Sequence, residues 1–315
     1  MPQIQWQSDK IEVSEETDPI EVCYQNGWTD GLPVVPPTPD RVERMLAGTN
    51  RKPDELISTI PPKWGRGSVE RIAINAVMAG CKPEYLPVVI AAVEGITSEK
   101  FNLHGIQVTT SLVSPMLIIN GPIRKQLELN DGFNVFGQGW RANATIGRAV
   151  RLICTNIGGA LPGELDRATF GHSGKYTYCI AEKEEVSSWN PLHVERGFEP
   201  SESTVTVFAG ASPQSINDHG NNTAEGILDT ICRSLAVPGA TPGELFLVVS
   251  PEHTKTIADD GFSKVDVQQY VEEHTNRNPG DVVVIVAGGP AGRWTMAIFG
   301  WGAPSSRSIT VQIDS

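Results

Sequence analysis

The sequence of residues 244–287 is ELFLVVSPEHTKTIADDGFSKVDVQQYVEEHTNRNPGDVVVIVA. Its two apolar runs, Glu244–Ser250 and Asp281–Ala287, have the length and β-branched content of buried strands, and two helical segments separate them. Upstream, Thr204–Ala209 is a predicted strand and Thr223–Leu235 a predicted helix. Strands that alternate with helices are typical of an α/β layer built on a parallel sheet. We therefore predict an α/β fold whose carboxyl-terminal part holds a largely parallel open sheet.

Two more strands are expected downstream, Trp294–Phe299 and Ile309–Ile313, at a sheet edge or in a hairpin. The glycine-rich loop Ala287–Gly292 follows an apolar strand, as a dinucleotide-binding loop would. Such a loop must lead into a helix, whereas a strand is predicted next, so no dinucleotide cofactor is expected. The loop Gly210–Asn222 joins a strand to a helix, a usual position for ligands in open α/β sheets, although turn chemistry alone also explains its Asn and Gly content.

Helical patterns dominate the amino-terminal half of the chain. Apolar residues form one stripe between Val69 and Gly80, and Pro83 begins a second helical segment that runs through Val93. Arg141–Ile157 is a third amphipathic helix, and Met116–Asn120 is a buried strand. These patterns predict a helix-rich first lobe that contains a mixed sheet.

Composition divides the chain into an arm and two lobes. Residues 1–17 are polar and predict an amino-terminal arm. The stretch from 186 to 203 is rich in Pro, Ser and Glu, which predicts a boundary between a first lobe at 18–190 and a second α/β lobe at 191–315. A chain of 315 residues can bury a full core for this architecture.

Charge and cysteine content narrow the classes of function. The net charge of −12 argues against non-specific attraction to nucleic acid or to an anionic membrane, which needs a basic patch. The amino terminus has no signal-peptide pattern, and no apolar run is long enough to span a bilayer. The five cysteines lack the paired spacing of zinc sites and predict reduced thiols in a cytoplasmic protein.

The segment from 136 to 184 mixes glycines with Arg, Asn, His and Tyr, and it is the predicted small-molecule site. Arg141 and Arg148 share the polar face of one helix with Asn143 beside them. Guanidinium groups bind carboxylates and phosphates bidentately, and an Asn amide can hold a developing oxyanion. We predict that Arg141, Asn143, Arg148 and Tyr178 bind the substrate. The alternative is a set of structural salt bridges, with partners such as Asp131, Glu164 or Asp166.

Two residues are predicted to carry the chemistry. Cys81 lies between two helices, with Lys82 beside it, and a thiol near a helix amino terminus and a cation can become a nucleophilic thiolate. The alternative is a small buried residue at a helix corner. His172 lies in the loop Gly171–Gly174, where flanking glycines leave room for a general acid or base; the alternative is an exposed turn histidine.

Two other kinds of function stay open. A metal-dependent hydrolase or lyase would need His172, His104 or His219 to converge with carboxylates, because no metal motif is present in the sequence. A non-catalytic partner subunit would use exposed tryptophans, and the candidates are Trp28, Trp64 and Trp301. The motif Trp28–Pro33 is a candidate lid or subunit contact, and a homo-oligomer is also open.

Four segments resemble a bacterial family that is largely uncharacterised. They are WTDGLPVVPPTPDRVERMLAG (28–48), INAVMAGCKPEYLPVVIAAVEG (74–95), NATIGRAVRLICTNIGG (143–159) and GHSGKYTYCIAE (171–182). Some members of that family are grouped with UGSC-type selenoproteins, named for a selenocysteine-Gly-Ser-Cys motif. The chain has no Cys-Gly-Ser-Cys counterpart, so the resemblance implies no selenoprotein-like redox role. It points instead to Ala79-Gly80-Cys81 and the helix from Asn143 to Gly159.

From these features we predict an enzyme that acts on a small polar, anionic substrate. Cys81 would serve as nucleophile or redox thiol, and His172 as acid or base. Hydrolysis or elimination is expected rather than dinucleotide-dependent redox chemistry, and no cofactor is predicted apart from the metal left open above.

Overall fold

The computed structural model describes residues 6–186, 188–236, 243–302 and 306–314, and it has the expected α/β fold. The α-helices are α1 (Pro19–Gln25), α2 (Pro39–Leu46), α3 (Val69–Ala79), α4 (Leu86–Ile96), α5 (Leu103–Val108), α6 (Ile123–Gln126), α7 (Arg141–Asn156), α8 (Leu192–Glu195), α9 (Ala224–Leu235), α10 (Pro251–Asp259) and α11 (Lys264–His274). The strands are β1 (Leu56–Ile60), β2 (Gly65–Ser68), β3 (Ser114–Asn120), β4 (Cys179–Ala181), β5 (Thr204–Gly210), β6 (Gln214–Asn217), β7 (Leu245–Val249), β8 (Val282–Val286), β9 (Trp294–Phe299) and β10 (Ile309–Gln312).

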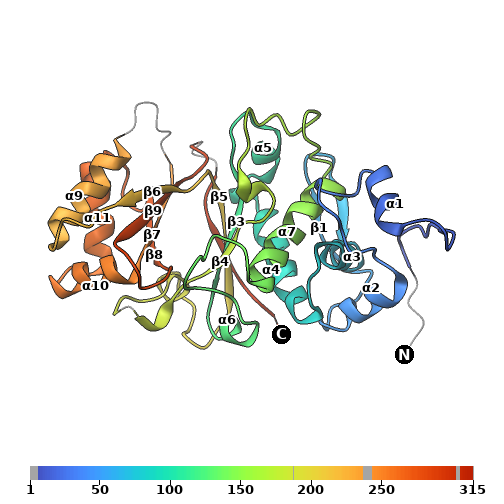
Figure 1. Ribbon diagram of the computed structural model, residues 1–315, viewed down its shortest axis with the longest axis horizontal. Coiled ribbons are helices and arrows are strands. Elements are labelled where there is room, and N and C mark those ends of the chain that lie inside the picture. Colours follow the sequence, from blue (N-terminus) through green and yellow to red (C-terminus); the bar gives the residue numbers. More distant parts are fainter. Residues whose placement is uncertain (1–5, 187, 237–242, 303–305, 315) are drawn as a thin grey trace.

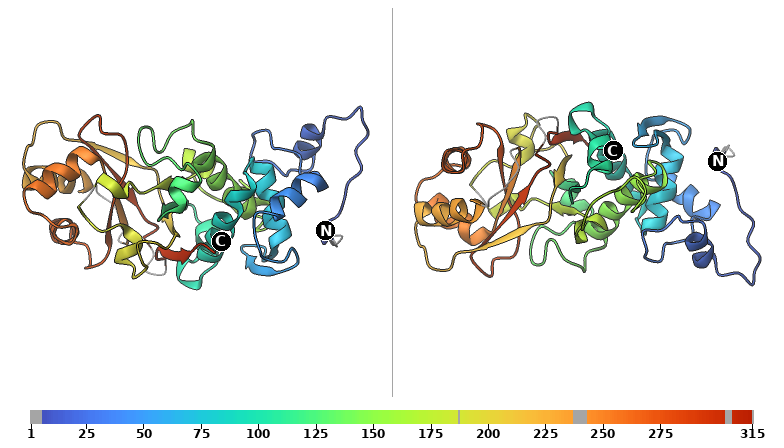
Figure 2. Two further views of the ribbon diagram at one scale, coloured as in Figure 1. Left: turned by 90° about the horizontal axis from the view of Figure 1, so that it is seen from below. Right: turned by 90° about the horizontal axis from the view of Figure 1, so that it is seen from above.

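The described residues form two four-stranded sheets that pack face to face, with helices on both outer sides. One sheet has the order β10-β5-β3-β4, the other β6-β9-β7-β8, and β1 and β2 form a separate hairpin. Figure 1 shows α9, α10 and α11 outside the second sheet and α4, α7 and α3 outside the first. Phe208 and Phe246 meet between the sheets, with ring centroids 4.2 Å apart. The architecture is therefore a helix–sheet–sheet–helix sandwich, extended beyond α3 by the hairpin, α2 and α1 (Figures 1 and 2).

Because both faces of each sheet are covered, three of the strands are buried along their whole length and are largely apolar. Every residue of β3, β7 and β8 is buried. On β3, Met116 and Ile118 face the second sheet, whereas Leu117 and Ile119 belong to the core under the helices. The alternation of side chains along a strand thus divides β3 between two hydrophobic cores.

The sheets differ in two respects from the predicted arrangement. The second sheet is mixed rather than largely parallel, because β9 pairs antiparallel with both β6 and β7 and only β7 and β8 are parallel. Of the last two strands, β10 lies at the edge of the first sheet, one of the two expected positions, whereas β9 lies inside the second sheet, so the two form no hairpin. The alternation of helices and strands along the sequence cannot reveal the antiparallel direction of β9, because its apolar pattern is like that of the neighbouring strands.

The strands also do not separate at the boundary predicted near residue 190. β5 lies downstream of that point, yet it pairs antiparallel with β3 along its whole length. β10 then pairs with β5 and completes the first sheet. Of the predicted arm, residues 1–5 lie outside the described residues, and the backbone N–H groups of Gln7 and Ser8 donate to the Glu70 carboxylate.

The helix α7 takes its position from α3 and the first sheet. Ser68 caps α3 by accepting from the Arg71 N–H, and Gly80 ends it with φ of +91°, a conformation that favours glycine. Gly147 of α7 lies against β4: a Cβ there would be 2.5 Å from Thr177 Oγ1 and 2.6 Å from the Tyr178 nitrogen. Glycine therefore permits this close approach of helix and strand.

No helix in the described part of the chain combines the length and apolar composition needed to cross a membrane.

Candidate functional site

The predicted site residues are divided among several structural contacts. Arg141 donates through Nε and Nη2 to the carbonyl of Gly80, at 3.0 and 2.9 Å. It therefore caps the carboxyl end of α3, where a cation also meets the negative end of the helix dipole. Arg148 makes two hydrogen bonds to Asp30, both at 2.8 Å, and a third to the carbonyl of Pro33.

Asn143 and Tyr178 are buried, and both make internal hydrogen bonds. The Asn143 amide accepts from the Asn130 N–H and donates to the carbonyls of Asn130 and Cys179. Tyr178 donates its hydroxyl to the carbonyl of Ala211, and burial raises the pKa of its phenol. These partners use the polar groups that a substrate would need.

Cys81 is also buried, and it lies against α7. Its Sγ donates to the carbonyl of Thr145 at 3.3 Å. Burial raises the pKa of the thiol to about 12, and the hydrogen bond from the thiol and the charge of Arg141 counteract this only in part. The environment therefore favours the protonated thiol at neutral pH.

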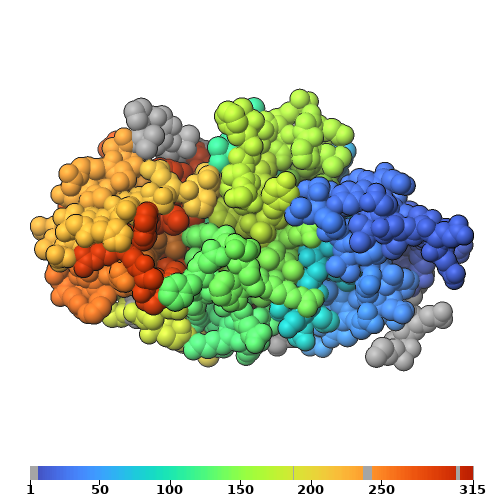
Figure 3. All heavy atoms as spheres, viewed as in Figure 1, coloured from blue at the N-terminus to red at the C-terminus, as the bar shows by residue number. Residues whose placement is uncertain are grey.

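A pocket of about 550 Å³ lies beside these residues, between the polar face of α7 and two loops. One loop contains Thr29, Asp30 and Gly31, and the other runs from Leu161 to Tyr176. In Figure 3 the second loop, in yellow-green, stands against the blue amino-terminal segment. The bidentate bond between Arg148 and Asp30 holds the first loop against α7 at this wall.

Three charged side chains at this pocket form a partly buried triad. Asp166 accepts from Lys175 Nζ at 2.8 Å through Oδ1 and at 2.6 Å through Oδ2, and from Arg151 Nη2 at 3.3 Å. Two cations therefore face one carboxylate, while the charge of Asp30 is already paired with Arg148. Counted together with Arg148, these side chains leave one positive charge while Lys175 is protonated and none when its amine is neutral.

The pKa of Lys175 is lowered in this environment. Burial is the largest cause, the nearby charge of Arg151 adds to it, and Asp166 opposes it through its hydrogen bond and its charge. A lysine with a lowered pKa has a larger neutral fraction near pH 7 and can accept a proton.

His172 lines the same pocket but has limited freedom as an acid or base. Its Nδ1 accepts from the Gly174 N–H at 3.2 Å, so the neutral ring carries its proton on Nε2. Nε2 is buried and makes no hydrogen bond to any described residue. Burial lowers the pKa of the imidazole, Lys175 lowers it further, and the Gly210 carbonyl opposes both. This environment favours the neutral imidazole, which meets the Tyr178 ring in an edge arrangement with ring centroids 5.5 Å apart.

Of the six predicted site residues, only His172 lines this pocket, and Arg148 supports its wall. Sequence reasoning missed Lys175 and Arg151, and it named Asp166 only as a salt-bridge partner. Lys175 stood in the predicted loop, three residues after His172, but no local motif distinguishes a lysine that will be partly buried.

The histidines proposed for a metal have separate neighbours. His104 stacks on Trp64, His219 meets the edge of Trp294, and His172 contacts Tyr178. Within the described ranges no three His, Cys, Asp or Glu side chains are grouped to hold a metal ion. Of the tryptophans considered for an interface, Trp64 is exposed, whereas Trp28 and Trp301 pack in part against the core.

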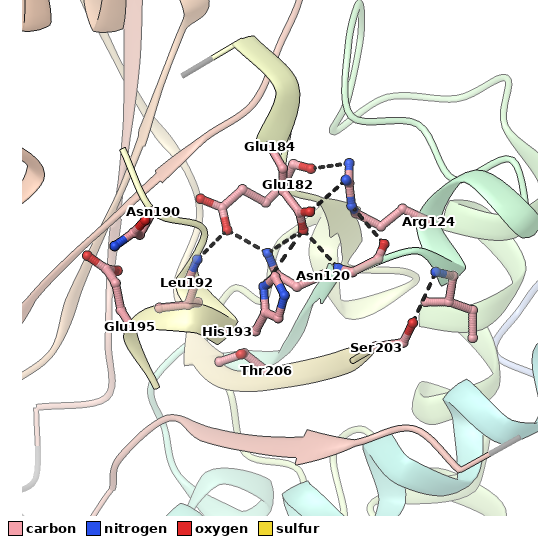
Figure 4. Close-up of polar contacts among 12 residues, drawn as sticks. Asn120, Arg124, Glu182, Glu184, Asn190, Leu192, His193, Glu195, Ser203 and Thr206 are labelled. Atoms are coloured by element: carbon pink, nitrogen blue, oxygen red, sulfur yellow. Dashed lines mark hydrogen bonds and ion pairs between the residues drawn. The ribbon is translucent and has the colours of Figure 1, made fainter. Parts of the chain in front are cut away.

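A second polar cluster lies where β3 and β4 end (Figure 4). Asn120 donates to Glu182 at 2.6 Å and to Glu184 at 3.0 Å, and Glu184 also binds Arg124 at 2.8 Å. His193 is fully buried beside them, with Nδ1 3.9 Å from a Glu184 oxygen.

This cluster joins the two sheets. Lys264, at the start of α11, lies 3.7 Å from Glu182 and 2.8 Å from Glu195 of α8. Glu182 also accepts from the Leu192 N–H. Because these ionised groups are paired across elements from both sheets, we assign them a structural role.

No protein-family model matches this chain, and no curated protein is significantly similar to it.

Proposed function

We propose that the protein is an enzyme that acts on a small anionic molecule in the pocket of Arg151, Asp166 and Lys175. The observation that carries this proposal is Lys175, a partly buried lysine with a lowered pKa that lines a pocket beside Arg151 and Asp166. Arg151 and protonated Lys175 attract an anion, and the neutral Lys175 amine can take up a proton.

The reaction class that these groups support is proton transfer in an elimination or a hydrolysis. In an elimination, the anionic group of the substrate is held near Arg151 while Lys175 accepts a proton from the neighbouring carbon. The electrons of that C–H bond form the double bond, and the leaving group on the next carbon departs with the electrons of its own bond. In a hydrolysis, the same amine accepts the proton of the attacking water. Asp166 orients the ammonium group in both cases, since it binds Lys175 through both of its oxygens.

This proposal keeps the anionic substrate predicted for the chain and moves the chemistry away from Cys81. The thiol is buried and bonded to a backbone carbonyl, and its pKa is raised to about 12. An amine that already lines a pocket needs less rearrangement to meet a substrate.

The test combines anion binding with turnover in two substitutions of one residue. A panel of small carboxylates and phosphates is screened by calorimetry and by product analysis. Lys175→Arg keeps a cation but cannot accept a proton, so it should retain anion binding and lose turnover by about a hundredfold or more. Lys175→Met should weaken binding as well.

Lys82→Met is the matched control, because Lys82 is exposed and does not line the pocket. Full turnover in Lys175→Arg would show that Lys175 takes no part in proton transfer. Binding of anions that is unchanged in Lys175→Met would show that the pocket is not where they bind.

A further inference from the structure

A second pocket, of about 460 Å³, lies at one end of the strands of the second sheet. Strands β6, β7 and β8 run in the same direction, because β6 and β7 are both antiparallel to β9 and β8 is parallel to β7. Their carboxyl-terminal ends therefore lie at the same end of the sheet. The pocket opens there, between Ser250 after β7 and the loop Ala287–Gly292 after β8. Open α/β sheets commonly bind ligands at the carboxyl-terminal ends of their strands.

The opposite wall comes from the loop between α6 and α7, and backbone hydrogen bonds hold this region against the second sheet. Residues 133–137 form this wall. The Gly288 N–H donates to the carbonyl of Asp131 at 2.8 Å, and the Lys183 N–H donates to that of Val286 at 2.7 Å. In Figure 3 the green segment that contains 133–137 abuts the red segment near residue 290. The pocket is thus preformed rather than dependent on a mobile contact.

The chemistry of this lining is unlike that of the Lys175 pocket. It has no charged side chain, and its walls include Phe133, Phe136, Trp294 and Met296. Phe133 and Trp294 are 57% and 41% exposed, although rings of this size are normally buried. Aromatic and thioether side chains around a concave surface are typical of sites for flat apolar ligands.

Glycines let the two exposed rings lie flat against the backbone. A Cβ on Gly289 would be 2.1 Å from the Phe133 ring, and a Cβ on Gly292 would be 3.0 Å from Trp294. Gly288 and Gly292 also have φ of +104° and +150°, which side chains disfavour. The glycine-rich loop is therefore required for the aromatic walls, which explains its composition without a phosphate-binding role.

Two polar side chains line this pocket, Asn134, whose Nδ2 donates to the carbonyl of Gln138, and Ser250. Ser250 Oγ accepts long hydrogen bonds from the backbone N–H groups of His253 and Trp294, each at 3.4 Å. A hydroxyl that accepts twice still has its own proton to donate.

We propose that this pocket binds a planar, uncharged aromatic molecule that carries a hydrogen-bond acceptor. The ring system fits between Phe133 and Trp294, and its acceptor meets the Ser250 hydroxyl. The absence of charge among the lining residues selects against anions, which the Lys175 pocket attracts. The two pockets therefore take different ligands, and this inference does not depend on the proposed reaction.

The test uses prodan, a neutral naphthalene ketone whose fluorescence rises in apolar surroundings. We expect saturable binding of one probe per chain. Phe133→Ala and Trp294→Ala should each weaken the affinity by about fivefold or more, as expected for the loss of one aromatic contact. Both rings are partly exposed, so these variants are expected to fold.

Two control variants locate the probe. Phe170→Ala removes another exposed ring, at the Lys175 pocket, and Lys175→Met removes that pocket's amine. Neither should change prodan affinity. Hydrogen exchange with bound prodan should slow at residues 133–137 and 288–294 and stay unchanged at 161–176.

One contrary result is that prodan binds more weakly to Phe170→Ala or Lys175→Met and with unchanged affinity to Phe133→Ala and Trp294→Ala. That result would place the probe in the Lys175 pocket and overturn the proposal. Binding that does not saturate, or that no variant changes, would overturn it as well.

Discussion

The guanidinium of Arg148 donates two hydrogen bonds to the carboxylate of Asp30, from Nε to Oδ2 and from Nη2 to Oδ1, each at 2.8 Å. The residues lie 118 positions apart in sequence, and the Asp30 side chain is only 6% exposed. This pair fixes the Trp28–Pro33 loop on α7 and makes it a wall of the Lys175 pocket. The motif considered as a lid or subunit contact thus belongs to the pocket's frame.

Asp30→Asn should detach this loop. It leaves the Arg148 charge unpaired in a largely buried position, so we expect the free energy of unfolding to fall by about 2–4 kcal/mol. Urea denaturation measures this loss, and limited proteolysis should find a new cleavage site near residue 31. Asp54→Asn is the control, since Asp54 is exposed. Equal stability of the two variants would contradict a role for the pair.

The pKa of Lys175 should move in opposite directions in two variants. Asp166 raises this pKa and Arg151 lowers it, while burial acts in both variants. Asp166→Asn should therefore lower the pKa of Lys175 further, and Arg151→Met should raise it. The values can be read from the NMR titration of ¹³C-labelled lysine.

The same shifts predict the pH dependence of activity. If the neutral amine is the proton acceptor, activity increases as pH rises through the pKa of Lys175. The acidic limb of kcat/KM should then move to lower pH in Asp166→Asn and to higher pH in Arg151→Met. If the acidic limb of the kcat/KM profile stayed in place while the NMR titration of Lys175 shifted, the limb would belong to another titrating group.

Cys81 should behave as an unreactive thiol. With its pKa raised to about 12, it remains protonated at pH 8, and iodoacetamide should modify it much more slowly in the folded protein than in urea. Mass spectrometry of the alkylated peptides measures both rates. Cys81→Ser should keep turnover within about threefold of the parent, because the Ser hydroxyl can still donate to the Thr145 carbonyl. Rapid alkylation of Cys81 in the folded protein would restore the nucleophile hypothesis.

Arg141 should affect stability rather than substrate affinity. Arg141→Met removes two hydrogen bonds to the Gly80 carbonyl and the favourable interaction with the α3 dipole. We expect a loss of about 1 kcal/mol in the free energy of unfolding, with KM unchanged. An increase in KM without a change in stability would return Arg141 to the binding site.

Local patterns predicted the helices and strands well where one face of an element is apolar. The helix expected at Arg141–Ile157 is α7, and the strand expected at Met116–Asn120 is β3, extended to Ser114. Just before β4, the Thr177 hydroxyl donates to the carbonyls of Asn143 and Ala144 and holds the chain against α7. β4 then begins at Cys179.

The site was less predictable because it depends on pairing across long separations. The polar face of α7 was expected to bind a substrate, but Arg148 and Arg141 have protein partners more than 60 residues away. The cation left for the pocket, Lys175, gains its character from burial and from Asp166 and Arg151. Neither burial nor these neighbours can be read from the residues beside it.

The pairing of β5 with β3 and β10 has a consequence for how the chain is made. While the ribosome synthesises the first 200 residues, β3 has only the short β4 beside it, and its other edge is open. That edge is a run of buried apolar residues, SPMLIIN, which can pair with a strand of another chain. Protection arrives only with Thr204–Gly210, and residues 309–312 then add the strand beyond β5. Fragments that stop near residue 190 should therefore aggregate, and the nascent chain should need a chaperone at this edge until Thr204–Gly210 has been made.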